Sequence, residues 1–70
     1  MTNKNFVAID QTFKIGKKEY KVLGFSSDNG VEYWKIQSLK DNGVINHVRK
    51  TYLDEKLREN KELNKHLLID

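Results

Sequence analysis

Residues 20–50 read YKVLGFSSDNGVEYWKIQSLKDNGVINHVRK, and this stretch decides the fold. The tripeptide Asp-Asn-Gly occurs in it twice, at 28–30 and at 41–43, each time between runs rich in β-branched and aromatic residues. Asn-Gly between such runs is the strongest short-range signal of a β-hairpin. The stretch therefore predicts three antiparallel strands, at 18–25, 31–39 and 44–50, joined by two tight turns.

The turns also predict how the strands pair. If each turn is a three-residue loop with a left-handed glycine, Ser27 lies opposite Val31 and Lys40 lies opposite Val44. The pairs that follow are Val22–Ile36, Gly24–Trp34 and Ile36–Val48. One face of the sheet then carries the apolar side chains of Tyr20, Val22, Trp34, Ile36, Val44 and Val48.

The flanking segments complete a single α+β domain. Residues 1–10 are expected to form an N-terminal arm or edge strand, and the alternation in 12–15 predicts a short strand before a turn at Gly16. Residues 51–68 predict a helix that starts at a Thr51–Asp54 capping box. Its apolar stripe contains Asn60 and Asn64 near the middle, which predicts a break or kink near Asn60, or a far half that binds elsewhere. We expect a three- to four-stranded antiparallel meander, spanning 11–50, packed on this C-terminal helix.

Composition limits the classes of function. The net charge is +3. Residues 11–50 contribute +4, from eight basic against four acidic side chains, and residues 51–70 contribute −1, from four against five. Cysteine is absent, which is compatible with the cytoplasm, and no apolar run approaches the about 18 residues that span a bilayer. We expect a cytoplasmic protein without a membrane partner.

The sequence contains no pattern typical of an enzyme. The two histidines, His47 and His66, fall in different predicted elements, without the spacing of a metal site. The four glycines form no phosphate-binding loop, and neither serine of the Ser26-Ser27 pair has a base at local spacing. We therefore expect no catalysis, no metal and no cofactor.

The second face of the predicted sheet is the candidate functional site. Leu23, Phe25 and Tyr33 form an apolar end, which segment 6–15 is expected to cover. The other end is polar and basic, and sheets that bind nucleic acid combine such residues with aromatic side chains. The candidate contacts to DNA or RNA are Lys21, Tyr33, Lys35, Gln37, His47, Arg49 and Lys50. The competing interpretation is an ordinary solvated sheet face.

A protein partner is the alternative. The apolar residues Leu63, Leu67 and Leu68 are candidates for a partner or dimer contact if nothing else covers them. The chain would then be an interaction module, such as a phage-type inhibitor that docks on a host or defence protein through a sheet edge or the helix. The sequence leaves monomer and weak homodimer open.

The order of Tyr33-Trp34-Lys35-Ile36, Gly43, Val48 and Leu53 resembles one kind of DNA-binding module. It is similar to the three-stranded-sheet-plus-helix domains of plant ethylene-response factors, phage homing proteins and integrase arm-binding domains, over residues 16–58. The resemblance implies major-groove binding by Lys21, Lys35, Gln37, His47 and Arg49. The arginine-rich strands and Cys-Gly motifs of those families are missing here. The composition also resembles that of phage or prophage accessory proteins.

Overall fold

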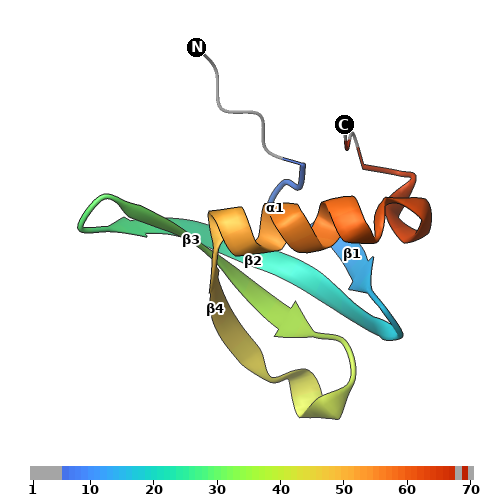
Figure 1. Ribbon diagram of the computed structural model, residues 1–70. Helices are drawn as coiled ribbons and strands as arrows, with labels where there is room; N and C mark the ends of the chain where they lie inside the picture. The colour runs from blue at the N-terminus through green and yellow to red at the C-terminus, as the bar shows by residue number, and fades with distance from the viewer. Residues whose placement is uncertain (1–5, 68, 70) are drawn as a thin grey trace.

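The structure, a computed structural model, describes residues 6–67 and 69 and confirms the α+β fold. Four antiparallel strands form one sheet in chain order, and a helix follows them (Figure 1). The strands are β1 (Thr12–Ile15), β2 (Lys18–Asp28), β3 (Val31–Ser38) and β4 (Ile45–Arg49). The helices are the 3₁₀ turn η1 (Asp41–Gly43), α1 (Lys50–Glu59) and the 3₁₀ segment η2 (Lys61–Asn64). None of these helices is long and apolar enough to cross a membrane.

The first hairpin turn is shorter than predicted. Asp28 pairs with Val31, so the loop is the two residues Asn29 and Gly30, and the predicted pair Ser27–Val31 is wrong. Both loop residues have positive φ, 51° for Asn29 and 78° for Gly30. This conformation suits Asn-Gly and matches the right-handed twist of the two strands.

A β-bulge at Leu23 compensates for the shorter turn. The register between β2 and β3 shifts between Val22 and Gly24, so that Val22 pairs with Ile36, as predicted, although the turn differs. Beyond the bulge Phe25 pairs with Trp34, which makes the predicted pair Gly24–Trp34 wrong. Phe25 was expected on the second face, but it lies on the face of Trp34 instead. It meets the Trp34 ring edge-on, with 4.7 Å between the ring centroids.

The second turn is longer than predicted. Ile36 pairs with Asn46 and Trp34 with Val48, so the predicted pair Ile36–Val48 is wrong by two positions. The longer loop contains η1, where Asn42 and Gly43 both have positive φ. Because the shift is even, each β4 side chain keeps its predicted face. Gln37 braces this loop, since its Nε2 donates a hydrogen bond of 3.1 Å to the Gly43 carbonyl.

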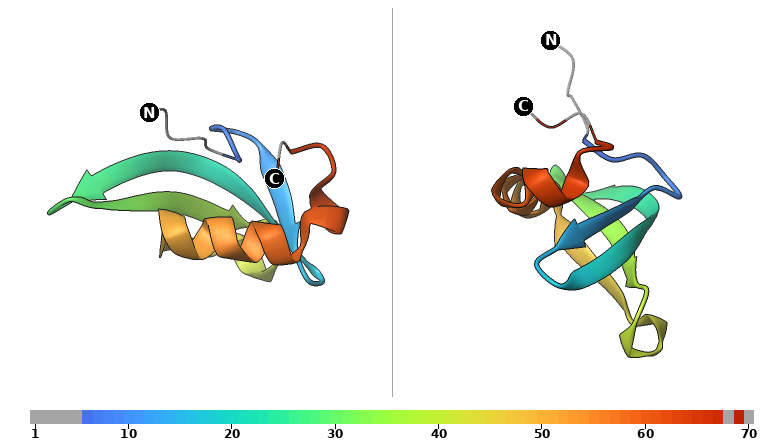
Figure 2. Two further views of the ribbon diagram at one scale, coloured as in Figure 1. Left: turned by 45° about the horizontal axis from the view of Figure 1, so that its top comes forward. Right: turned by 90° about the vertical axis from the view of Figure 1, so that its right-hand side faces the viewer.

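The core lies on one face of the sheet, beneath α1 (Figure 2). Phe13, Val22, Trp34 and Ile36 point into it from the strands, and the helix and C-terminal segment add Leu53, Leu57 and Leu67. The N-terminal residues Phe6 and Val7 are also buried in this core, and the Arg58 guanidinium lies over the Phe6 ring. The expectation that this segment covers the second face is therefore wrong, because Phe6, Val7 and Phe13 join the core on the helix side.

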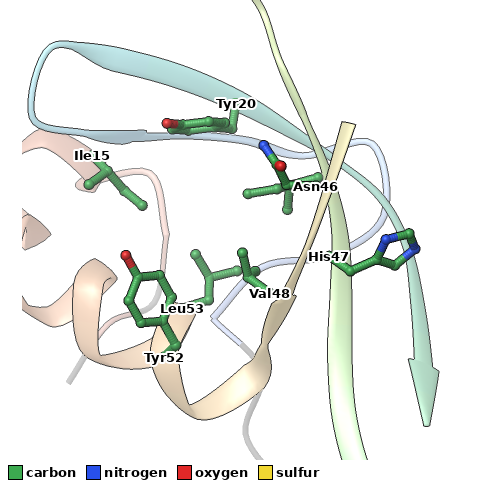
Figure 3. A pocket seen from close by; sticks show the side chains of 8 residues that line it. Ile15, Tyr20, Asn46, His47, Val48, Tyr52 and Leu53 are labelled. Atoms are coloured by element: carbon green, nitrogen blue, oxygen red, sulfur yellow. The ribbon is translucent and has the colours of Figure 1, made fainter. Parts of the chain in front are cut away.

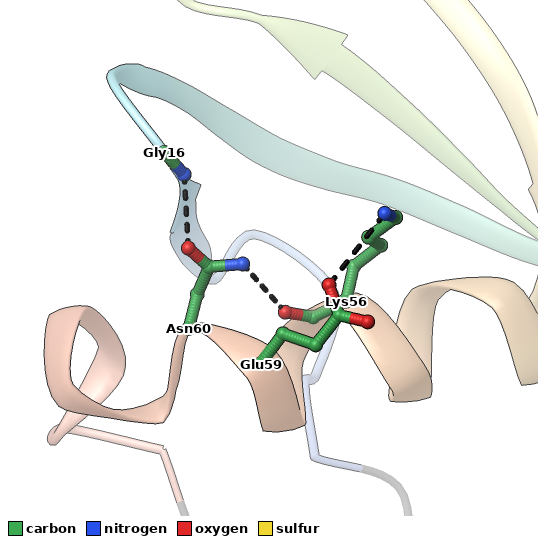
Figure 4. A network of polar contacts seen from close by, with 4 residues as sticks. All are labelled: Gly16, Lys56, Glu59 and Asn60. Carbon is green, nitrogen blue, oxygen red and sulfur yellow. Dashed lines mark hydrogen bonds and ion pairs between the residues drawn. The ribbon is translucent and has the colours of Figure 1, made fainter.

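Helix α1 begins one residue earlier than predicted, at Lys50, and no side chain caps its N-terminus. The predicted Thr51–Asp54 capping box is wrong, because Asp54 pairs with Lys50 instead. The predicted break near Asn60 is confirmed. The Asn60 backbone N–H and side-chain Nδ2 both donate to the Lys56 carbonyl, beside an ion pair between Lys56 and Glu59 (Figure 4).

The two asparagines inside the apolar stripe bind the outer edge of β1. Asn64 is fully buried, and its amide accepts from the Lys14 N–H at 2.6 Å and donates to the Lys14 carbonyl at 2.8 Å. Asn60 Oδ1 accepts from the Gly16 N–H (Figure 4), and His66 Nε2 lies 2.7 Å from the Thr12 carbonyl. These side chains satisfy backbone groups that an edge strand otherwise leaves unpaired.

Replacement of Asn64 by alanine is expected to destabilise the fold. It leaves the Lys14 N–H and carbonyl without their partner, which costs about 2 to 3 kcal/mol of unfolding free energy. Urea denaturation measures the loss, and exposed Asn46→Ala is the control, with an expected change within about 0.5 kcal/mol. Equal stability of the two variants would show that the Asn64 contacts do not hold β1.

Candidate nucleic-acid interface

Only one face of the sheet is covered by the described helices (Figure 2). The opposite face, here called the open face, is defined by three cross-strand pairs, because residues directly opposite each other in an antiparallel sheet share a face. These pairs are Lys21–Gln37, Lys35–His47 and Tyr33–Arg49. Their sequence neighbours Val22, Trp34, Ile36 and Val48 point into or against the core, which confirms the alternation. The structure thus places six of the seven predicted contact residues on the open face.

Three members of the open face are exposed cations or potential cations: Lys35, His47 and Arg49. In the described part of the chain, none of the ion pairs involves Lys35 or Arg49. Lys21 is 3.9 Å from Asp10, and the two side chains are 41% and 78% exposed, so this pair is weak. The basic charge on this face is therefore available to an anionic ligand.

Lys50, the seventh predicted contact, lies elsewhere. Its Nζ donates to Asp54 Oδ2 at 2.9 Å, and the two side chains are only 13% and 14% exposed. The reason is that α1 starts at Lys50, which brings Asp54 one helical turn away and within reach. Lys50 was instead expected at the end of the third predicted strand.

The predicted partner surface does not form as a unit. Leu67 is 5% exposed and belongs to the core, whereas Leu63 is 47% exposed. Leu68 lies outside the described residues. The apolar cluster expected at the C-terminus is thus divided between the core and the surface.

Two features of the open face were missed. Lys14 lies opposite Glu19, and its neighbours Phe13 and Ile15 turn toward the core, so the exposed Lys14 side chain extends the open face onto β1. The alternation of polar and apolar residues in Thr12–Ile15 already indicated that Lys14 points away from the core. The second feature is a hollow beside Gly24, of about 370 Å³, which depends on the bulge and had no recognised signal in the sequence.

A separate cavity of about 280 Å³ lies on the helix side (Figure 3). Ile36, Val48 and Leu53 give it apolar walls, and Tyr20, Tyr52 and Asn46 surround it, while the His47 ring points away from it. No described carboxylate lines this cavity or the hollow. Within residues 6–67 and 69, moreover, no three His, Cys, Asp or Glu side chains are grouped as metal ligands.

Comparison of the chain with protein-family models, with curated proteins and with solved structures finds no match.

The ion pair of Lys50 predicts a difference in chemical reactivity between two lysines. The exposed Lys35 amine should react with an acetylating reagent several times faster than the Lys50 amine, which Asp54 shields. Mass spectrometry of peptides after brief acetylation measures both rates. Asp54→Ala should raise the rate at Lys50 and leave Lys35 unchanged. Equal rates in the unmodified protein would contradict the placement of Lys50.

Proposed function

We propose that this protein is a small, non-enzymatic nucleic-acid-binding protein that holds its ligand on the open face. The observation that carries the proposal is that the three cross-strand pairs gather Lys21, Lys35 and Arg49 on a surface that no described helix covers. Lys14 adds a fourth cation from β1. Phosphate groups dominate the affinity of such proteins, and lysine and arginine are their usual partners.

The remaining open-face residues suit contacts to bases and sugars. His47 lies between the two exposed cations, with Lys35 directly across and Arg49 two residues along β4. Gln37 uses its Nε2 on the η1 loop, which leaves its carbonyl oxygen as an acceptor. Tyr33, opposite Arg49, offers a ring for stacking. A cytoplasmic location, expected from the cysteine-free sequence, would give access to nucleic acid.

The C-terminal surface supports a protein partner less well. Leu67, one of three residues proposed for that contact, is a core residue. A simpler interpretation of the open face is that its charged side chains only keep an uncovered sheet face solvated. Variants that remove single charges from the open face without unfolding the protein separate a nucleic-acid site from these two alternatives.

Fluorescence anisotropy with labelled duplex and single-stranded DNA and RNA tests the proposal. Four phosphate contacts predict that log K falls with log salt with a slope of about −3.6 for duplex and about −2.8 for single strands. The titrations should run from about 50 to about 200 mM salt, where such binding weakens measurably. No binding to any of these probes at the lowest salt would overturn the proposal.

Charge-neutralising variants locate the site. Lys35→Gln and Arg49→Gln should each weaken binding and reduce the salt slope by about one, because each removes one phosphate contact. The matched controls are Lys50→Gln, whose amine is already paired, and Lys61→Gln, an exposed residue of η2. If Lys61→Gln weakens binding as much as Lys35→Gln, the ligand is not held by the open face.

A further inference from the structure

The open face is not flat, because β2 carries a bulge and a glycine side by side. The register shifts at Leu23, and Gly24 lies directly opposite Lys35 on the open face. A Cβ built on Gly24 would meet no heavy atom within 4 Å, so the space above its backbone is empty of protein. Glycine inside a strand often marks a bulge or a place where a ligand approaches the backbone closely.

The space above Gly24 is the hollow of about 370 Å³ in the open face. Leu23 and Phe25 are its apolar lining residues, and Ser26, Lys35 and His47 provide polar groups. Lys35 and His47 are cross-strand partners, and Tyr33 lies diagonally across, opposite Ser26. A hollow with a bare peptide floor, apolar lining residues and hydrogen-bonding groups around it fits a flat heteroaromatic ring.

We propose that this hollow receives one nucleobase of a single-stranded nucleic acid. The inference rests on the function proposed above and deepens it. The base would lie on the Gly24 backbone against Leu23, with the Ser26 hydroxyl and the His47 ring within reach of its polar edge and Lys35 beside its phosphate. A base stacked inside a duplex cannot enter such a hollow without leaving the stack, which costs free energy. The protein should therefore prefer single strands to duplex.

A phosphate group is the other ligand that Lys35, His47 and Ser26 would accept. A base is favoured because one side of the hollow is the apolar Leu23 side chain, which gains nothing from a phosphate. Abasic oligonucleotides, which keep the phosphates and lack the bases, separate the two ligands.

Gly24→Val tests the hollow without changing charge. The valine side chain fills space that is empty, and the Gly24 φ lies outside the left-handed region, so the fold is expected to remain intact. A β-branched residue also suits a strand better than glycine. Single-strand affinity should fall about tenfold, the size expected for the loss of one stacked base, while the salt slope stays the same. Duplex affinity should not change.

Ser27→Val is the matched control. Ser27 is an exposed residue of the same strand but pairs with Glu32, on the face opposite to that of Gly24. Anisotropy with single-stranded, abasic and duplex probes, together with circular dichroism of each variant, completes the experiment. Normal single-strand binding by a folded Gly24→Val protein would overturn the inference and leave the proposed function standing. Abasic probes that bind as tightly as normal ones would also overturn it. Failure of the unmodified protein to bind any probe would overturn both.

Discussion

The β-bulge at Leu23 determines what each face of the sheet carries. One extra residue in β2 puts Phe25 on the same face as Trp34, where it meets the edge of the core although it stays 42% exposed, and leaves Gly24 opposite Lys35 on the open face. Without the bulge, the strand would expose an aromatic ring among the cations and place a glycine against the tryptophan. The bulge thus places an aromatic ring beside Trp34 and leaves the hollow at Gly24 in a single change of register.

The second constraint is the attachment of β1. A four-residue strand at the edge of a small sheet is held weakly by its own ladder. Here Asn64 and His66 contact its outer backbone groups, and Asn60 binds the Gly16 N–H just after the strand. The C-terminal segment therefore ties the first strand to the last elements of the chain. This attachment fixes Lys14 on the open face, and it occupies the outer backbone groups of β1, which a passing strand would otherwise pair with.

Much of this architecture follows from local patterns. Alternation identifies the strands, Asn-Gly identifies the turns, and the asparagines in the apolar stripe identify the break at Asn60. The bulge and the first turn were not predictable, because they depend on how Phe25 packs on Trp34 across two strands. The length of the second turn was not predictable either, because it depends on the contact of Gln37 with the η1 loop. The open face was still largely predicted, since the β4 register error was even and Val22 still paired with Ile36. Lys50 was misplaced because helix and strand meet at that residue, and the role of Asn64 required the position of β1.

Nucleic acid is proposed to lie on the open face. The most direct measurement is a titration of isotope-labelled protein with a single-stranded oligonucleotide, followed by NMR of the backbone amides. We predict that the largest shifts cluster at Gly24, Lys35, His47 and Arg49, in β2, β3 and β4. Shifts concentrated on α1 and η2, or none at a saturating concentration of the oligonucleotide, would contradict it.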